Sequence, residues 1–232
     1  MRADAERNAE RLRAAAAELF HERGLQVSVK EIARRAGVSH GTLYNLFGTR
    51  EALVDEVVAD LAAARLKEAA EEAAARTDAW DGFAYYVERV CELQATDPAL
   101  NDVLTRQYPG ACRLMAVCER AHAAAAHIIE RAQQAGTLRA DFTREDLLFI
   151  FATNAPLSRA AADVVPDAWR RGVDFMLDGL RAEAGRPLPA GAMTPDQVNQ
   201  ILANLAARPG PAARPDLPAQ PDPPGRPAQP GR

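Results

Sequence analysis

Eight residues between positions 30 and 50 are suited to contact with a charged and polar partner. Seven of them have polar or charged side chains, and the eighth is a glycine. The segment from residue 37 to residue 47 reads GVSHGTLYNLF and mixes hydroxyl, imidazole, phenol and amide groups with apolar anchors. Such groups can hold phosphate oxygens and read base edges through hydrogen bonds. The candidates are Lys30, Ser39, His40, Gly41, Thr42, Tyr44, Asn45 and Arg50.

Two short helices on either side of a turn at Gly37 must position these side chains. Helices that cross at about 90–120° need small or apolar residues where they meet, and Ala33 lies four residues before the glycine. Ser28 with Glu31 predicts a capping box for the first helix, and Ser39 can cap the second. The other inward positions are all apolar: Val29, Ile32, Ala36, Val38, Leu43 and Leu46. The pattern predicts a helix-turn-helix motif, with an ordinary helical hairpin as the alternative.

The second helix of this motif would face the partner with its polar side. The first turns of such a helix read bases in the major groove of DNA, whereas hydroxyl and backbone N–H groups commonly hold phosphates. His40, Gly41, Tyr44 and Asn45 point outward in this register, and Thr42 lies near the first turn. Gly41 removes a side chain where the backbone must come close to its partner.

The chain is acidic as a whole but basic around this motif. It has 232 residues, a net charge of -4 and a pI of about 5.7, so no protein-wide positive field attracts nucleic acid. Between residues 24 and 50, four cations outnumber the single anion Glu31 by three: Lys30, Arg34, Arg35 and Arg50. Arg34 and Arg35 could equally be a solvated helix end. Any contact with nucleic acid must therefore come from this local patch.

The remaining polar residues favour neither an enzyme nor a metal site. Cys118 and His122 share a helix face, with Glu119, His127 and Glu130 nearby, but two plausible ligands do not make a site. No catalytic or glycine-rich phosphate signature appears elsewhere. Three cysteines in no disulfide or zinc spacing, no signal-peptide core and no membrane-spanning run predict a cytoplasmic protein with reduced thiols. We expect no cofactor and no metal.

The pattern along the rest of the chain predicts an all-α fold. Ala/Leu/Glu/Arg-rich segments cover roughly residues 51–76, 78–95, 110–135, 143–160 and 166–184, and no alternating strand pattern appears. Twelve of the 16 prolines lie from Pro187 onward. Residues 186–232 are therefore predicted to form a mostly disordered tail, with a possible short amphipathic helix at 194–207.

The stretch VSVKEIARRAGVSHGTLYNLFGTREALVDEVV, with the helix before it, resembles the DNA-binding domain of the TetR family of bacterial transcriptional regulators over about residues 8–58. The resemblance implies that Tyr44, Arg50 and Thr42 hold phosphates, and that His40 and Gly41 read bases. Leu46 stands where many members of the family have His, and Arg50 stands where many have Lys. Both residues keep the apparent role of the residue that they replace. The resemblance also implies the division into domains: a three-helix DNA-binding domain at 1–58 and a helical ligand-binding and dimerisation domain at 59–185.

One such module reads only a few base pairs, so tight binding favours a homodimer on a palindromic double-stranded operator. The last two long helices are apolar on more than one face, which suits a four-helix bundle shared by two subunits. Repression is the commoner mode of the family, although the sequence does not distinguish a repressor from an activator. The alternative is a helical small-molecule-binding or interaction protein that has lost DNA binding; the intact motif argues against it.

A small, mostly apolar effector of unknown identity is expected among the fifth to eighth helices, where aromatic and polar groups interrupt aliphatic helices. Asn154 is the best single candidate, because a buried amide needs a partner; it could instead satisfy backbone groups freed by Pro156. Plain core packing is the alternative for the whole set. The candidates are Trp80, Phe83, Tyr86, Val87, Leu104, Gln107, Tyr108, Met115, Phe149 and Asn154.

Overall fold

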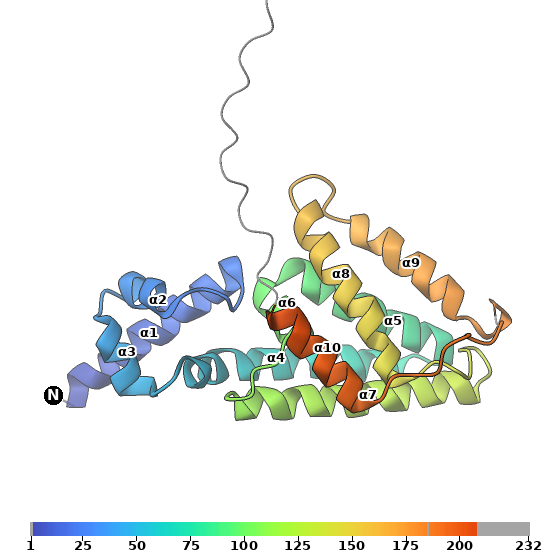
Figure 1. Ribbon diagram of the computed structural model, residues 1–232, viewed down its shortest axis with the longest axis horizontal. Coiled ribbons are helices and arrows are strands. Elements are labelled where there is room, and N and C mark those ends of the chain that lie inside the picture. The colour runs from blue at the N-terminus through green and yellow to red at the C-terminus, as the bar shows by residue number, and fades with distance from the viewer. Residues whose placement is uncertain (1, 185, 208–232) are drawn as a thin grey trace, which may run out of the picture.

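The computed structural model describes residues 2–184 and 186–207, and its regular structure there is helical (Figure 1). The α-helices of these residues are α1 (Arg2–Arg23), α2 (Val29–Ala36), α3 (His40–Phe47), α4 (Arg50–Ala75), α5 (Ala79–Thr96), α6 (Pro98–Thr105), α7 (Cys112–Gln134), α8 (Leu147–Ala161), α9 (Ala168–Leu180) and α10 (Pro195–Ala207). Two 3-10 turns span Arg144–Asp146 and Ala182–Ala184. The predicted all-α fold is confirmed.

The first three helices pack together around apolar side chains that belong to the continuous core of the molecule. Leu12, Leu19 and Phe20 recur on one face of α1, because three and four residues separate neighbours on a helix surface. These side chains are almost fully buried, as are Ile32 of α2 and Leu43 of α3. The polar face of α3 is therefore held by a rigid three-helix support.

The long helix α4 joins this support to the rest of the molecule. Thr49 begins the helix by accepting a hydrogen bond from the N–H of Ala52 at 3.0 Å. Near its start, Glu56 accepts from Arg13 of α1 at 2.6 Å, and α4 also packs against α3. Its later turns pack against α5 and α7 (Figure 1). The predicted domain boundary at residue 58 lies inside this continuous helix, so a tilt of α4 would reach both parts.

A buried carboxylate makes a second link between the two parts. Asp102 of α6 accepts the backbone N–H of Leu25, in the loop between α1 and α2, at 2.7 Å. Arg106 and Arg159 lie 3.3 Å and 3.5 Å from the same side chain. Gly24 has a φ of 78°, and a Cβ there would lie 2.6 Å from Asp102. Only glycine allows this approach without rearrangement.

Replacing Asp102 with alanine should lower the free energy of unfolding by about 1–3 kcal/mol, because the buried Leu25 N–H loses its acceptor. Asp102→Asn keeps an acceptor oxygen and should cost less than Asp102→Ala. Urea denaturation of both variants would measure the difference. Asp163→Ala, at an exposed position between α8 and α9, is the matched control. Equal stability of the Asp102→Ala and Asp163→Ala proteins would show that this link does not hold the two parts together.

The short helix predicted at 194–207 is confirmed as α10. Its first turn is capped reciprocally by Thr194 and Gln197, which exchange hydrogen bonds at 2.8 Å and 3.3 Å. Asn199 accepts a hydrogen bond from Gln107 at 2.9 Å, which ties α10 to the segment after α6. The disorder predicted for residues 208–232 lies outside the described residues.

Candidate nucleic-acid interface

The turn between α2 and α3 has the predicted cap and glycine geometry, with one correction. Gly37 adopts a left-handed conformation (φ 66°, ψ 35°), and a Cβ there would lie 2.6 Å from a guanidinium nitrogen of Arg11. Ser28 accepts the N–H of Glu31 at 3.2 Å. The Glu31 carboxylate binds Arg23, so the predicted capping box is only half formed. An opposite charge from α1 attracts this carboxylate more strongly than a backbone N–H.

Ser39 begins α3 as predicted, and its hydroxyl also organises Thr42. Ser39 Oγ accepts the backbone N–H of Thr42 at 3.1 Å and lies 2.8 Å from Thr42 Oγ1. With one N–H accepted, the Ser39 hydroxyl can donate its proton to Thr42 Oγ1. The Thr42 hydroxyl proton is then available to an outside acceptor such as a phosphate oxygen.

The outward side of α3 is polar and exposed. Tyr44 is 42% exposed, and its ring meets that of His40 edge-on, with centroids 5.0 Å apart. Asn45 and Gly41 are exposed beside them. A Cβ on Gly41 would meet nothing closer than Ser39 Oγ at 3.9 Å, and its φ is not positive. The fold itself therefore has no need of glycine at position 41.

The cations around α3 differ in whether a nearby carboxylate already neutralises their charge. Lys30 on α2 is exposed and Arg50, the first residue of α4, is half-buried; within residues 2–184 and 186–207, neither forms an ion pair. Arg34 is exposed and lies 3.9 Å from Glu31. Arg35 is bound to the carboxylates of Glu18 and Glu22 on α1, each at 3.2 Å. Counting Arg35 in the predicted basic patch was therefore wrong, because its charge is compensated by acids outside the counted window.

The ten residues predicted to surround an effector lie on α5, α6, α7 and α8 and in the segment after α6. Trp80, Phe83, Tyr86 and Val87 are buried core residues of α5, and burial raises the pKa of the Tyr86 phenol. Leu104 and Met115 are partly buried, on α6 and α7, while Gln107 and Tyr108 lie in the segment after α6, which ends at Thr105. Phe149 is 57% exposed on α8. A solvent-facing side chain cannot line an interior pocket of this subunit, so its inclusion is corrected.

Asn154 has the buried partners that its sequence context required. Its amide nitrogen donates to the backbone oxygen of Cys91 at 3.3 Å and to Gln94 Oε1 at 2.9 Å. Ser158 donates to Asn154 Oδ1 at 3.3 Å. The amide thus joins α8 to α5 through satisfied hydrogen bonds, and this side chain has no remaining need for a ligand.

Sequence reasoning missed a cavity between two of the long helices. It has a volume of about 670 Å³ and lies between α4 and α7, and none of the ten predicted residues lines it. Its walls are mostly alanines and aliphatic residues, which in the sequence are typical of ordinary helix packing. The available signal was the run of small residues on two helices that face each other.

Two negative findings concern the part of the chain that the structure describes. No helix there is long and apolar enough to cross a membrane. No group of three or more His, Cys, Asp or Glu side chains in those same ranges is placed to hold a metal ion. Cys91 is buried, Cys112 is exposed and Cys118 is partly buried, and all three are free thiols.

Solved structures of several regulators share this fold. A TetR family regulator, PfmR from Thermus thermophilus, is 20% identical, covers 76% of this chain and 99% of its own, and gives a TM-score of 0.52. FadR from Bacillus subtilis, solved with stearoyl-CoA, is 19% identical over 73% and 96% of the two chains, with a TM-score of 0.53. RolR, solved with resorcinol, is 21% identical over 82% and 99%, with a TM-score of 0.51. A search of curated proteins gave no match.

Two family models match the sequence itself, one in each part of the molecule. The model described as bacterial regulatory proteins, tetR family, matches residues 12–57, which include all of α2 and α3. The model described as the C-terminal domain of SbtR-like transcriptional regulators matches residues 78–182. TetR family proteins are DNA-binding regulators and not enzymes, which confirms the prediction of a non-enzymatic protein. Together the two matches identify the chain as a member of the TetR family of transcriptional regulators.

Proposed function

We propose that this regulator is a cytoplasmic repressor that binds a palindromic operator as a homodimer and leaves it when a small molecule binds. The observation that carries the DNA-binding part is the exposed polar face of α3, with a glycine that the fold does not require. A glycine in a helix costs about 0.5–1 kcal/mol relative to alanine. Close approach of the α3 backbone to the DNA accounts for that cost.

The roles of the individual side chains are those that the family resemblance implies, and their exposure and chemistry are compatible with them. His40 and Gly41 lie in the first turn of α3, from which base edges are read in the major groove. Tyr44 and the Thr42 hydroxyl hold phosphates, and Asn45 is exposed on the same helix. The remaining contacts, at the edges of this surface and at the helix cap, are assigned to Lys30, Ser39 and Arg50.

The exposed apolar surface on α8 and α9 supports a homodimer. Helices α8 and α9 pack against each other and lie away from α1–α3 (Figure 1). Five large apolar side chains on these helices and their connection are about half exposed or more: Phe149, Leu157, Val164, Val165 and Phe175. Apolar side chains gathered on one surface mark interaction sites. Pairing α8 and α9 with the same helices of a second copy gives a four-helix interface that covers them.

Release by a small molecule is supported by the architecture and by relatives of the same fold. FadR from Bacillus subtilis was solved with stearoyl-CoA and RolR with resorcinol. In this chain, α4 continues from α3 into the larger helical part, so a ligand there can change the position of α3. Ligand and operator then oppose each other, and each lowers the affinity of the other by the same factor.

Replacing Arg50 with alanine should weaken binding to all DNA sequences alike, because Arg50 is assigned a phosphate contact and no base contact. The slope of log affinity against log salt concentration should fall by about 1. Tyr44→Phe should also weaken binding uniformly. Fluorescence anisotropy with the DNA upstream of the gene and with an unrelated duplex, at several salt concentrations, measures both effects.

The matched control is Arg65→Ala, which removes an exposed arginine from a later turn of α4. It should leave the salt slope unchanged. An Arg50→Ala protein with the wild-type slope would remove Arg50 from the phosphate contacts. A wild-type protein that binds neither duplex would instead favour a ligand-binding protein without DNA binding.

A further inference from the structure

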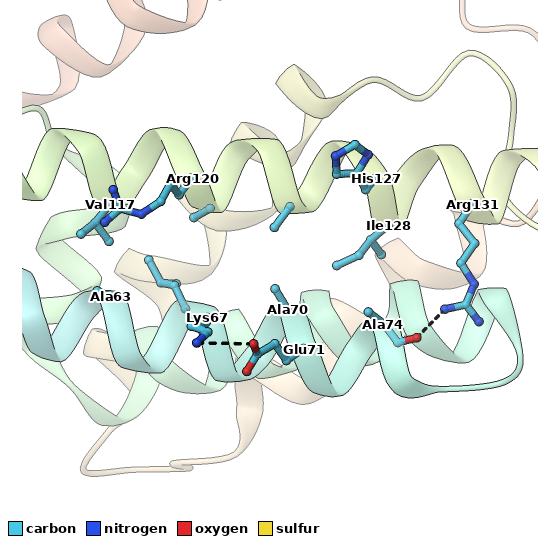
Figure 2. Close-up of a pocket in the computed structure, with 13 residues that line it drawn as sticks. Ala63, Lys67, Ala70, Glu71, Ala74, Val117, Arg120, His127, Ile128 and Arg131 are labelled. Carbon is cyan, nitrogen blue, oxygen red and sulfur yellow. Dashed lines mark hydrogen bonds and ion pairs between the residues drawn. The ribbon is translucent and has the colours of Figure 1, made fainter.

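The groove between α4 and α7 is long, and most of the residues that line it are apolar. Figure 2 shows the two helices side by side, with Val117 and Ile128 of α7 turned toward α4. Along α4 it runs from Ala63 to Ala74, about 16 Å at about 1.5 Å per residue. Its volume of about 670 Å³ lies within the range of about 300–1,000 Å³ that is usual for small-molecule sites. A slot of this shape fits a straight hydrocarbon chain better than a compact ring system.

Small side chains create the slot. Alanine leaves space between two helices because its side chain is a single methyl group, whereas a larger residue would fill the gap. The lining alanines are Ala63, Ala70, Ala74, Ala121 and Ala124. An apolar chain that entered the slot would gain burial of its surface without displacing a large side chain.

The charges at the edge of the groove favour an anion. Lys67 is balanced by Glu71 at 3.5 Å. Arg131 donates to the backbone oxygens of Ala74 and Thr77, each at 2.9 Å. Arg120 is exposed and, within the described ranges of the chain, has no ion-pair partner. Its guanidinium is therefore available to a carboxylate or phosphate at the edge of the slot.

Polar contacts fasten the two helices beyond one end of the slot and at its other end. Asp55 of α4 accepts the N–H groups of Arg113 and Leu114, at 3.2 Å and 2.8 Å, in the first turn of α7. At the far end, Arg131 of α7 holds the last turn of α4 (Figure 2). A chain that is wider than the slot between these two attachments would push the helices apart and bend or tilt α4. Because α4 packs against α1 and α3, the tilt would move α3.

We propose that the α4–α7 groove is the effector site and that it takes an amphiphilic anion with a straight apolar chain. The chain lies along the alanines and its anionic head meets Arg120. A free fatty acid and its coenzyme A thioester share this chemistry. The consequence for DNA, a displacement of α4 that releases the operator, rests on the proposed function; binding in the groove does not.

Calorimetric titration of the full-length protein with dodecanoate, below its micelle-forming concentration and without DNA, tests the site. Ala124→Phe fills the slot and should weaken binding at least about tenfold, whereas Ala123→Phe, at an exposed position outside the groove, should not change it. Arg120→Gln should weaken dodecanoate binding about tenfold or more, since a hydrogen bond to a charged group is lost. The same change should leave dodecanol binding unaltered.

The possible outcomes separate the site, the ligand and the regulation. Equal dodecanoate affinity of the Ala124→Phe and Ala123→Phe proteins would overturn the groove as the site, with Ala70→Phe as a second filling variant if the first does not fold. Failure of wild-type protein to bind either dodecanoate or dodecanoyl-coenzyme A would overturn the ligand class. If both compounds bind, the one with the higher affinity identifies the head group.

Operator binding is measured separately by anisotropy. If the protein binds dodecanoate but recognises no DNA duplex, the groove stands as a ligand site and the proposed function as a DNA-binding repressor is contradicted. An operator affinity that saturating ligand leaves unchanged would remove the coupling through α4. A drop of about 5–150-fold in operator affinity, typical of allosteric coupling, would support it.

Discussion

Replacing Gly41 with leucine is expected to reduce operator binding to the non-specific level, about a thousandfold or more, while the fold remains at least as stable. The added side chain has room in the free protein, where a Cβ would meet only Ser39 Oγ at 3.9 Å. On DNA it would occupy the space between the α3 backbone and the bases. Gly41→Ala should raise the free energy of unfolding by up to about 1 kcal/mol. Urea denaturation and anisotropy on the same samples measure both properties.

A leucine at an exposed position away from this surface is the control. Ala64→Leu on α4 adds similar apolar bulk and should leave operator affinity unchanged. If Gly41→Leu bound operator as tightly as Ala64→Leu, the α3 backbone would not approach the DNA closely. If Gly41→Leu were strongly destabilised, the glycine would have a structural role instead.

The double variant Phe149→Asp, Phe175→Asp is expected to be a folded monomer with about a thousandfold weaker operator binding. The two rings are 57% and 63% exposed on α8 and α9, so aspartate is well solvated in the monomer. In the proposed dimer the carboxylates would be buried without partners, which is prohibitive. A monomer holds only one half-site and loses the benefit of joining two recognition helices. Analytical ultracentrifugation measures the oligomeric state.

Leu61→Asp, at a residue that is 43% exposed on α4, controls for the effect of a charge on an exposed apolar position. It should leave both the dimer and its DNA affinity intact. A dimeric double variant would place the interface elsewhere. A monomeric variant with undiminished operator affinity would show that DNA recognition does not require two subunits.

The recognition module could be predicted from sequence because its determinants are local. The left-handed Gly37, the Ser28 and Ser39 caps and the spacing of the apolar residues all act within about twenty positions. Each has few physical solutions, so the motif and the outward side of α3 follow directly. The half-formed capping box shows the limit: Glu31 binds Arg23 of α1, a tertiary contact that the local pattern does not contain.

The proposed effector site could not be predicted in the same way, because a cavity depends on how distant helices pack. Aromatic and polar residues such as Trp80 and Asn154 drew attention, yet the structure uses them to pack α5 and to join it to α8. The space itself lies where small residues of α4 and α7 fail to fill a gap. Small side chains that leave a gap between two helices look, in a single sequence, like ordinary helix-packing residues. The pairing of Arg35 with Glu18 and Glu22 was hidden for a similar reason.

The central claim is that a dimer recognises a specific DNA sequence through its two α3 helices. Selection of binding sites from a pool of random duplex DNA tests this claim most directly. Wild-type protein should enrich a palindrome whose half-sites are centred about 34–36 Å apart or at a multiple of that spacing. The His40→Ala protein should enrich the same palindrome with relaxed preference at one base pair in each half-site, a loss of about 1–3 kcal/mol at that pair. Folded, dimeric wild-type protein that enriches no sequence over the starting pool would contradict the account.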